Sequence, residues 1–158
     1  MSGIVAAIRV RGRVNVKDDI SETMRFLGLT RKMYCTLVPD RAELNGMVFK
    51  VKDYITWGEV DEKTLAKLIK ARGKITGDKP VTDAYVKANS KFQDISALAA
   101  AIVKGEAKMK DVAGLKSVFR LNPPRKGFER KGIKKPYSVG GALGYRKEKI
   151  KDLIERML

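Results

Sequence analysis

The hydrophobic pattern of the first 57 residues alternates between a two-residue period and a helical period, which restricts this segment to an α+β fold. Residues 4–10 are predicted to form a strand with one buried face, because a two-residue period places Ile4, Ala6, Ile8 and Val10 together and Arg9 opposite them. An amphipathic helix then begins at Asp18 or Asp19 and ends at Gly28. The remaining predicted elements are a strand at 33–38, a helix after Asp40 and a strand at 54–57.

Five short elements with short connections favour a small antiparallel or mixed sheet with both helices on one face, a split βαβ arrangement of ferredoxin-like character. The two-residue period assigns the packed face of the first strand to Ile4, Ala6, Ile8 and Val10. The opposite, open face would carry a row of guanidinium groups from Arg9, Arg11 and Arg13. The alternative is a solvated sheet face on which acidic side chains of a neighbouring strand pair with these arginines.

Beyond Gly58 the pattern becomes mostly helical. Helices are predicted to begin near Asp61, Thr82 and Asp94, and a short strand is predicted at 116–121. A last helix at 146–158 has an apolar stripe that can dock on the core. We therefore predict a βαβαβ core domain at 1–58 and a mostly helical C-terminal extension at 59–158.

Positive charge is concentrated near the C-terminus. The chain has 34 basic and 18 acidic residues, a net charge of +16, and residues 118–158 hold 12 of the basic and four of the acidic ones. The loop at 120–137 has seven basic residues against Glu129 alone, interrupted by prolines and glycines. Because it buries too little to offset its ordering entropy, we expect it to be mobile until it binds a partner. A charge of this size attracts polyanions, namely nucleic acid or an anionic membrane surface.

The basic loop and the arginine row are the candidate binding residues, because arginine and lysine contact phosphates and aromatic rings stack on unpaired bases. One alternative is a solvated loop that keeps the protein soluble. A second alternative is that Arg31 and Lys32 complement the C-terminal dipole of the first helix. A third is that Phe128 and Tyr137 dock on the core. The predicted RNA-binding residues are Arg9, Arg11, Arg13, Arg31, Lys32, Arg120, Arg125, Lys126, Phe128, Arg130, Lys131, Lys134, Lys135, Tyr137 and Arg146.

Several kinds of chemistry lack the residues they need. The chain has no histidine, which excludes an imidazole general base and the histidine-containing zinc sites. The single cysteine, Cys35, cannot form an internal disulfide and is expected to be a small buried residue in a reducing compartment. Neither Gly73-Lys74 nor the glycines at 140–144 match a phosphate-binding or dinucleotide motif. We therefore predict no catalytic residue, cofactor, metal site or membrane span.

Several short motifs in order resemble the large-subunit ribosomal protein family L-thirty, called L-seven in eukaryotes. They include Ile8-Arg9-Val10-Arg11-Gly12, Leu27-Gly28-Leu29, Gly46-Met47, Tyr54-Ile55 with Trp57-Gly58, Arg72-Gly73, Phe119-Arg120-Leu121 with Pro124-Arg125, and Gly140-Gly141 with Gly144 and Arg146. The resemblance covers essentially the whole chain. Short bacterial members correspond only to about residues 1–58, and the long basic N-terminal arm of eukaryotic members is absent, so the pattern is similar to the archaeal long form.

The resemblance implies a βαβαβ structural protein of the large ribosomal subunit, without catalysis and located in the cytoplasm. It implies partners in large-subunit rRNA, possibly 5S rRNA, and neighbouring ribosomal proteins, with no membrane and no small-molecule substrate. The alternatives are an RNA-processing factor, which would need an activated nucleophile or a metal cluster, and a free DNA-binding or architectural protein. Binding to a membrane surface is less favoured, because the apolar stripe of the last helix is typical of a core-facing helix.

Overall fold

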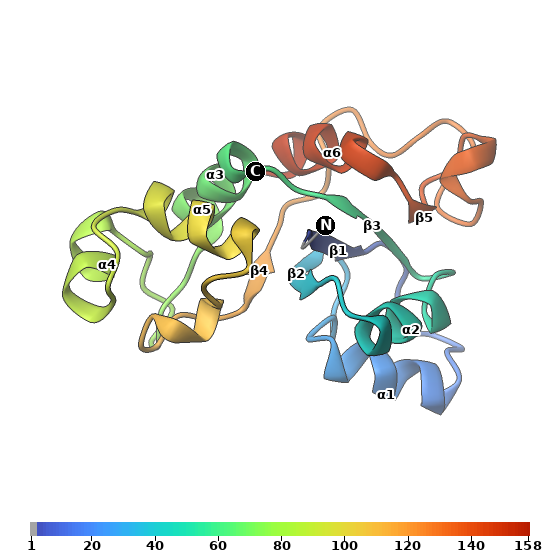
Figure 1. The fold of residues 1–158 in the computed structure, drawn as a ribbon. Coiled ribbons are helices and arrows are strands. Elements are labelled where there is room, and N and C mark those ends of the chain that lie inside the picture. Colours follow the sequence, from blue (N-terminus) through green and yellow to red (C-terminus); the bar gives the residue numbers. More distant parts are fainter. Residues whose placement is uncertain (1–2) are drawn as a thin grey trace.

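A five-stranded mixed sheet lies at the centre of the computed structural model, which describes residues 3–158 (Figure 1). The strand order is β4-β2-β1-β3-β5. The strands are β1 (Ile4–Arg9), β2 (Tyr34–Pro39), β3 (Ile55–Glu59), β4 (Val118–Arg120) and β5 (Gly144–Tyr145). The helices are α1 (Asp18–Phe26), α2 (Ala42–Lys50), α3 (Glu62–Arg72), α4 (Asp83–Asn89), α5 (Ile95–Lys104) and α6 (Ile150–Met157), and short 3₁₀ turns span Met109–Asp111, Tyr137–Val139 and Lys147–Lys149.

The predicted βαβαβ order and the α+β class are confirmed. Strand β1 is central and pairs antiparallel with both β2 and β3, so that Ile8 faces Cys35 on one side and Thr56 on the other. Helix α1 ends before Gly28, whose φ of 77° lies in the left-handed region that glycine adopts without strain. Helices α1 and α2 lie on the same face of the sheet, as expected (Figure 1).

The prediction of an open second face is wrong, because both faces of β1 are covered. Ala7, with Val5 beside it, packs in a cluster with residues of α1 and α2. The other side of the strand packs against α3, α5 and α6 through Ile4, Ala6 and Ile8. Figure 1 shows α1 and α2 on one side of the sheet and α3 and α6 on the other. The expectation overlooked that odd positions of the strand are apolar as well, and that Arg11 and Arg13 lie beyond its end.

Residues 59–158 complete the sheet as well as covering it. Strand β4 pairs antiparallel with β2, and β5, which was not predicted, pairs parallel with β3. Helix α3 begins as predicted, since Asp61 accepts a hydrogen bond from the Thr64 amide at 3.2 Å. Helix α6 begins at Ile150, four residues later than predicted, after the 3₁₀ turn at Lys147–Lys149. The extension therefore supplies both edge strands.

Candidate nucleic-acid interface

One end of the sheet brings together basic segments that are far apart in the chain. Strand β1 ends at Arg9, β2 begins just after Arg31 and Lys32, and the register pairs Tyr34 of β2 with Arg120, the last residue of β4. The cluster of Val10 with Ala142 and Leu143 joins the loop after β4 to the same place. The antiparallel pairing thus gathers residues 9–13, 31–32 and 120–137 at one end of the sheet, which we call the basic end.

Arg9 lies inside this end rather than on its surface. Its side chain is 2% exposed and donates to the carbonyl oxygens of Leu29 (2.8 Å), Arg11 and Gly12 (both 2.9 Å) and Thr30 (3.2 Å). Burial lowers the pKa of Arg9, and the charge of Arg13 lowers it further. The expectation of an exposed row is therefore wrong for Arg9, whose guanidinium holds together the loops after β1 and α1.

The neighbouring cations are more accessible. Arg11 is half-buried, lies over the ring of Tyr54 at 4.8 Å from its centroid, and donates to the Asp53 carbonyl at 3.1 Å. Arg13, Arg31 and Lys32 are exposed, and none of the three forms an ion pair within residues 3–158. Among the described residues, these three side chains therefore have no acidic cross-strand partner of the kind that would neutralise the sheet face.

Arg146 anchors the loop after β4 from within. It is 3% exposed and donates to the Thr56 hydroxyl at 2.7 Å, to the Ala142 carbonyl at 2.9 Å and to both carboxylate oxygens of Glu129. Burial raises the pKa of Glu129, but the hydrogen bond and charge of Arg146, a backbone hydrogen bond and the charge of Arg156 together outweigh burial, and the net direction is downward. Like Arg9, Arg146 is buried and bonded to protein oxygen atoms, so it holds the loop in place from the protein interior.

Six cations of the loop point into solvent. Within the described residues they form no ion pair and no side-chain hydrogen bond, whereas Arg120, at the end of β4, pairs with Asp78 at 3.8 Å and lies 5.9 Å from the centroid of the Tyr34 ring. These six side chains, called the loop cations below, are exposed and belong to Arg125, Lys126, Arg130, Lys131, Lys134 and Lys135.

The two aromatic residues of the loop have protein neighbours. Phe128 is half-buried and packs against the cluster of Val10 and Leu143 as well as the main core. The Tyr137 ring lies under Arg146, whose guanidinium carbon is 4.6 Å from the ring centroid. The alternative that these rings dock on the protein thus describes their packing here, and their stacking on bases stays a prediction.

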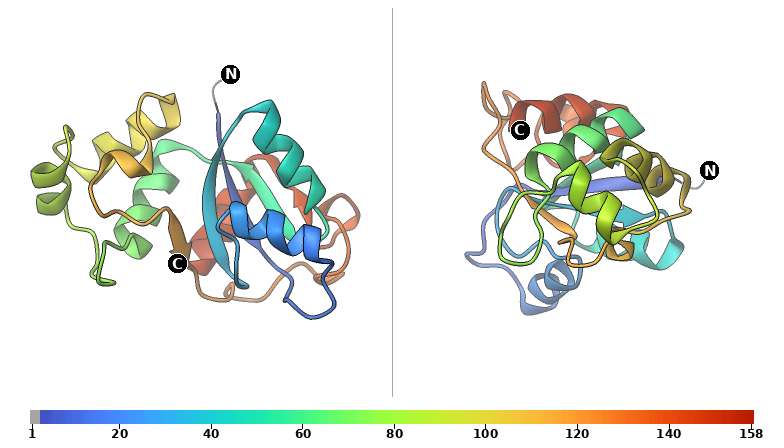
Figure 2. Two further views of the ribbon diagram at one scale, coloured as in Figure 1. Left: turned by 90° about the horizontal axis from the view of Figure 1, so that it is seen from below. Right: turned by 90° about the vertical axis from the view of Figure 1, so that its left-hand side faces the viewer.

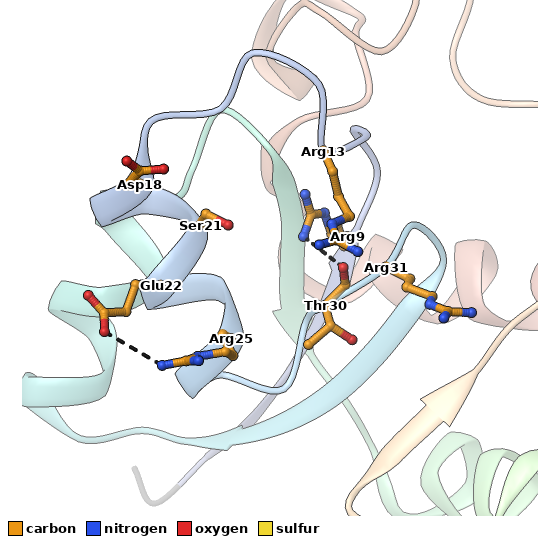
Figure 3. A pocket seen from close by; sticks show the side chains of 8 residues that line it. All are labelled: Arg9, Arg13, Asp18, Ser21, Glu22, Arg25, Thr30 and Arg31. Atoms are coloured by element: carbon orange, nitrogen blue, oxygen red, sulfur yellow. Dashed lines mark hydrogen bonds and ion pairs between the residues drawn. The ribbon is translucent and has the colours of Figure 1, made fainter.

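A cavity of about 550 Å³ opens beside the basic end, between α1 and the loops that follow β1 and α1 (Figure 3). Sequence reasoning identified three of its lining residues, Arg9, Arg13 and Arg31. It missed the rest of the lining, which is Asp18, Ser21, Glu22, Arg25 and Thr30. Residues of α1 gave no signal in the sequence, because their nearness to Arg13 depends on how the helix packs against the sheet.

Side chains suited to a metal ion do not gather in the described part of the chain. No group of three or more cysteine or acidic side chains suited to a metal ion occurs within residues 3–158. Burial raises the pKa of the Cys35 thiol to about 12, so it stays protonated and unreactive at neutral pH. None of the described helices is long and apolar enough to cross a membrane.

Comparison with known proteins gives one consistent family. Residues 5–55 match the model of the family described as ribosomal protein L30p/L7e. The chain is 50% identical over 149 residues to the large ribosomal subunit protein uL30 of Methanopyrus kandleri, and this alignment covers 94% of the chain and 100% of the relative. It is 49% identical to the protein of that name from Nanoarchaeum equitans, over 98% of this chain and 99% of the relative. For the protein of that name from Methanococcus maripaludis, the identity is 47% over 97% of this chain and 98% of the relative.

Proposed function

Because the chain belongs to the ribosomal protein L30p/L7e family, we propose that it is a structural constituent of the large ribosomal subunit that binds large-subunit rRNA through the basic end of its sheet. The family relation makes it a structural protein and not an enzyme, and the archaeal relatives make it an archaeal-type long form. The loop cations carry the proposal, because six neighbouring charges that have no ion-pair partner among residues 3–158 attract the phosphates of a polyanion.

The way these charges are displayed favours recognition of the RNA backbone. The loop cations project from turns, with no strand or helix to insert in a groove. The deep major groove of an A-form helix hides its base edges, so exposed lysines and arginines read phosphate positions and shape. Proximity to 5S rRNA, contacts with neighbouring ribosomal proteins and a cytoplasmic location in the assembled subunit complete the proposal, and they rest on the family relation.

Salt dependence of binding tests the RNA contact directly. If all six loop cations contact phosphates, the affinity of the full chain for large-subunit rRNA falls with log salt with a slope of magnitude roughly 4 to 5. Replacing Lys131, Lys134 and Lys135 together by Gln should reduce this slope by about 2. Filter binding at four salt concentrations measures both values.

A second triple variant controls for net charge. Lys63, Lys87 and Lys91 are exposed and unpaired among the described residues, and α4, which carries Lys87, lies at the opposite end of the molecule from the loop (Figures 1 and 2). Their replacement by Gln should leave the slope unchanged. A flat salt dependence, or equal effects of the two triple variants, would contradict binding through the loop.

Sedimentation tests the ribosomal assignment and separates it from the alternatives. The protein should travel with the large subunit in a low-salt gradient and be released by high salt or ribonuclease. Cross-linking in that fraction then shows whether 5S rRNA is adjacent. Recovery at the top of the gradient, together with preference for duplex DNA in competition, would favour a free architectural protein instead.

A further inference from the structure

The cavity beside α1 is a mixed-charge site with an arginine wall and a polar wall. Figure 3 shows the side chains of Arg9 and Arg13 next to each other on one side and Ser21 of α1 on the other. Asp18 and Glu22 also belong to the α1 wall, and Glu22 is paired with Arg25 at 3.6 Å. Two different kinds of chemical group therefore face the same space.

The arginine wall lacks an anionic partner among the residues that the structure describes. Arg9 is satisfied by carbonyl oxygens, which accept its N–H groups but carry no formal charge to neutralise it. Neither Arg9 nor Arg13 forms an ion pair within residues 3–158, and the charge of Arg13 contributes to the lowered pKa of Arg9. An anion bound at this wall would relieve the repulsion between the two guanidinium groups and take bidentate hydrogen bonds from Arg13.

The α1 wall is matched by a ligand that carries hydrogen-bond donors as well as an anionic group. Asp18 is a hydrogen-bond acceptor that repels phosphate, and the Ser21 hydroxyl both donates and accepts. Amino groups of bases and the ribose 2′-hydroxyl are donors that match such a wall. The volume of about 550 Å³ lies within the range of about 300–1,000 Å³ found for small-molecule sites and exceeds what a phosphate ion requires.

We propose that this cavity receives a single unpaired RNA nucleotide, with its phosphate against Arg9 and Arg13 and its ribose or base edge against Ser21 and Asp18. The inference rests on the proposed RNA binding and deepens it. The loop cations follow the backbone of the RNA irrespective of sequence, whereas the cavity selects a position where one nucleotide has left the stack.

Titration of the isotope-labelled full chain with small probes tests the site by NMR. The probes are the four nucleoside 5′-monophosphates, adenosine and inorganic phosphate. We expect the monophosphates to shift the amide signals of Ser21, Glu22 and Thr30, with tighter binding than either adenosine or phosphate. Signals that respond equally to inorganic phosphate and to nucleotides, or that do not respond, would overturn the proposal.

Three variants separate phosphate recognition, ribose or base recognition and the general effect of positive charge. Arg13→Gln should weaken nucleotide and phosphate binding roughly tenfold, because it removes a charge-assisted contact. Ser21→Ala should weaken nucleotide binding and leave phosphate binding unchanged. Arg125→Gln removes the same charge from a loop cation outside the cavity and should change neither. An equal loss for Arg13→Gln and Arg125→Gln would show a general charge effect and no site.

Binding of full-length large-subunit rRNA to the same variants separates this inference from the proposed function. Arg13→Gln and Arg125→Gln should each lower the salt slope by slightly less than one, and Ser21→Ala should lower affinity without changing the slope. A flat slope in the unmodified protein contradicts RNA binding as a whole. A normal slope combined with no effect of Ser21→Ala contradicts only the nucleotide site.

Discussion

Arg9 and Arg146 show that a guanidinium group within a basic segment does not have to face solvent. A guanidinium carries five N–H donors and cannot be deprotonated in practice, so it can be buried where oxygen atoms surround it. Four backbone carbonyls accept from Arg9, and a carboxylate, a hydroxyl and a carbonyl accept from Arg146. Both side chains therefore organise the loops whose other cations remain exposed.

The pair of Arg146 with Glu129 gives a prediction about stability and pH. Glu129→Gln leaves the buried Arg146 without its carboxylate and should lower the free energy of unfolding by about 3 kcal/mol at pH 7. The pKa of Glu129 in the folded protein is below its ordinary value of 4.5, so its stabilisation is present above that pH and is lost as the pH falls. The difference between wild type and variant should therefore shrink below pH 4.5.

Urea unfolding at pH 7, 5 and 3.5 measures this difference. Glu148→Gln is the control, because Glu148 is exposed and forms no ion pair in the described part of the chain. It should change stability by less than about 0.5 kcal/mol at each pH. A pH-independent loss in Glu129→Gln would mean that the carboxylate charge is not what stabilises Arg146.

The contact of β3 with the turn before α6 depends on Gly58. A Cβ atom at Gly58 would lie 2.1 Å from the Lys147 carbonyl oxygen and 2.9 Å from Ile150 Cβ, so the chain must shift to accept it. We expect Gly58→Ala to destabilise the protein by roughly 2–4 kcal/mol through displaced α6 packing. Thermal unfolding followed by circular dichroism measures this loss.

A matched glycine in α2 should respond in the opposite direction. Gly46 lies in the interior of the helix, and nothing lies within 4 Å of an added Cβ. Gly46→Ala should stabilise the protein by about 0.5–1 kcal/mol, since alanine favours the helix and restricts the unfolded chain. Equal destabilisation by the two substitutions would contradict the close approach at Gly58.

The basic loop offers a prediction about dynamics. Some of its amides close short turns within the loop, as Gly127 does to the Pro124 carbonyl at 3.0 Å and Gly132 to the Glu129 carbonyl at 2.9 Å. Local bonds of this kind open at lower free energy than the sheet, so these amides should exchange with solvent faster than those of β1. Hydrogen exchange should slow in the loop when rRNA is added, and unchanged exchange would contradict ordering by RNA.

Helices and strands with a strong local signal were predictable at this scale. Asp61 at the start of α3 and Gly105 at the end of α5, with a φ of 79°, act on the residues next to them. Strand β5 was not predictable, because two residues carry no period and its pairing with β3 joins positions 88 residues apart.

Residues 3–58 depend on the extension that covers them. Without residues 61–158, the side of β1 formed by Ile4, Ala6 and Ile8 would lose its packing partners. A fragment of residues 1–60 should therefore bind a hydrophobic dye and unfold without a sharp transition, and adding residues 61–158 should restore the transition. A fragment that unfolds as cooperatively as the full chain would support a self-contained domain at 1–58.

The order of the early elements, the ends of most helices and the excess of positive charge follow from the amino-acid sequence alone, because periodicity, caps and composition act over a few residues. Which charges remain available to a partner depends on the three-dimensional packing. The periodicity of the sequence could not show that both faces of β1 are covered, that Arg9 and Arg146 are buried, or that Ser21 faces Arg13 across a cavity. These features depend on contacts between segments far apart in the chain, and local sequence patterns do not specify such contacts.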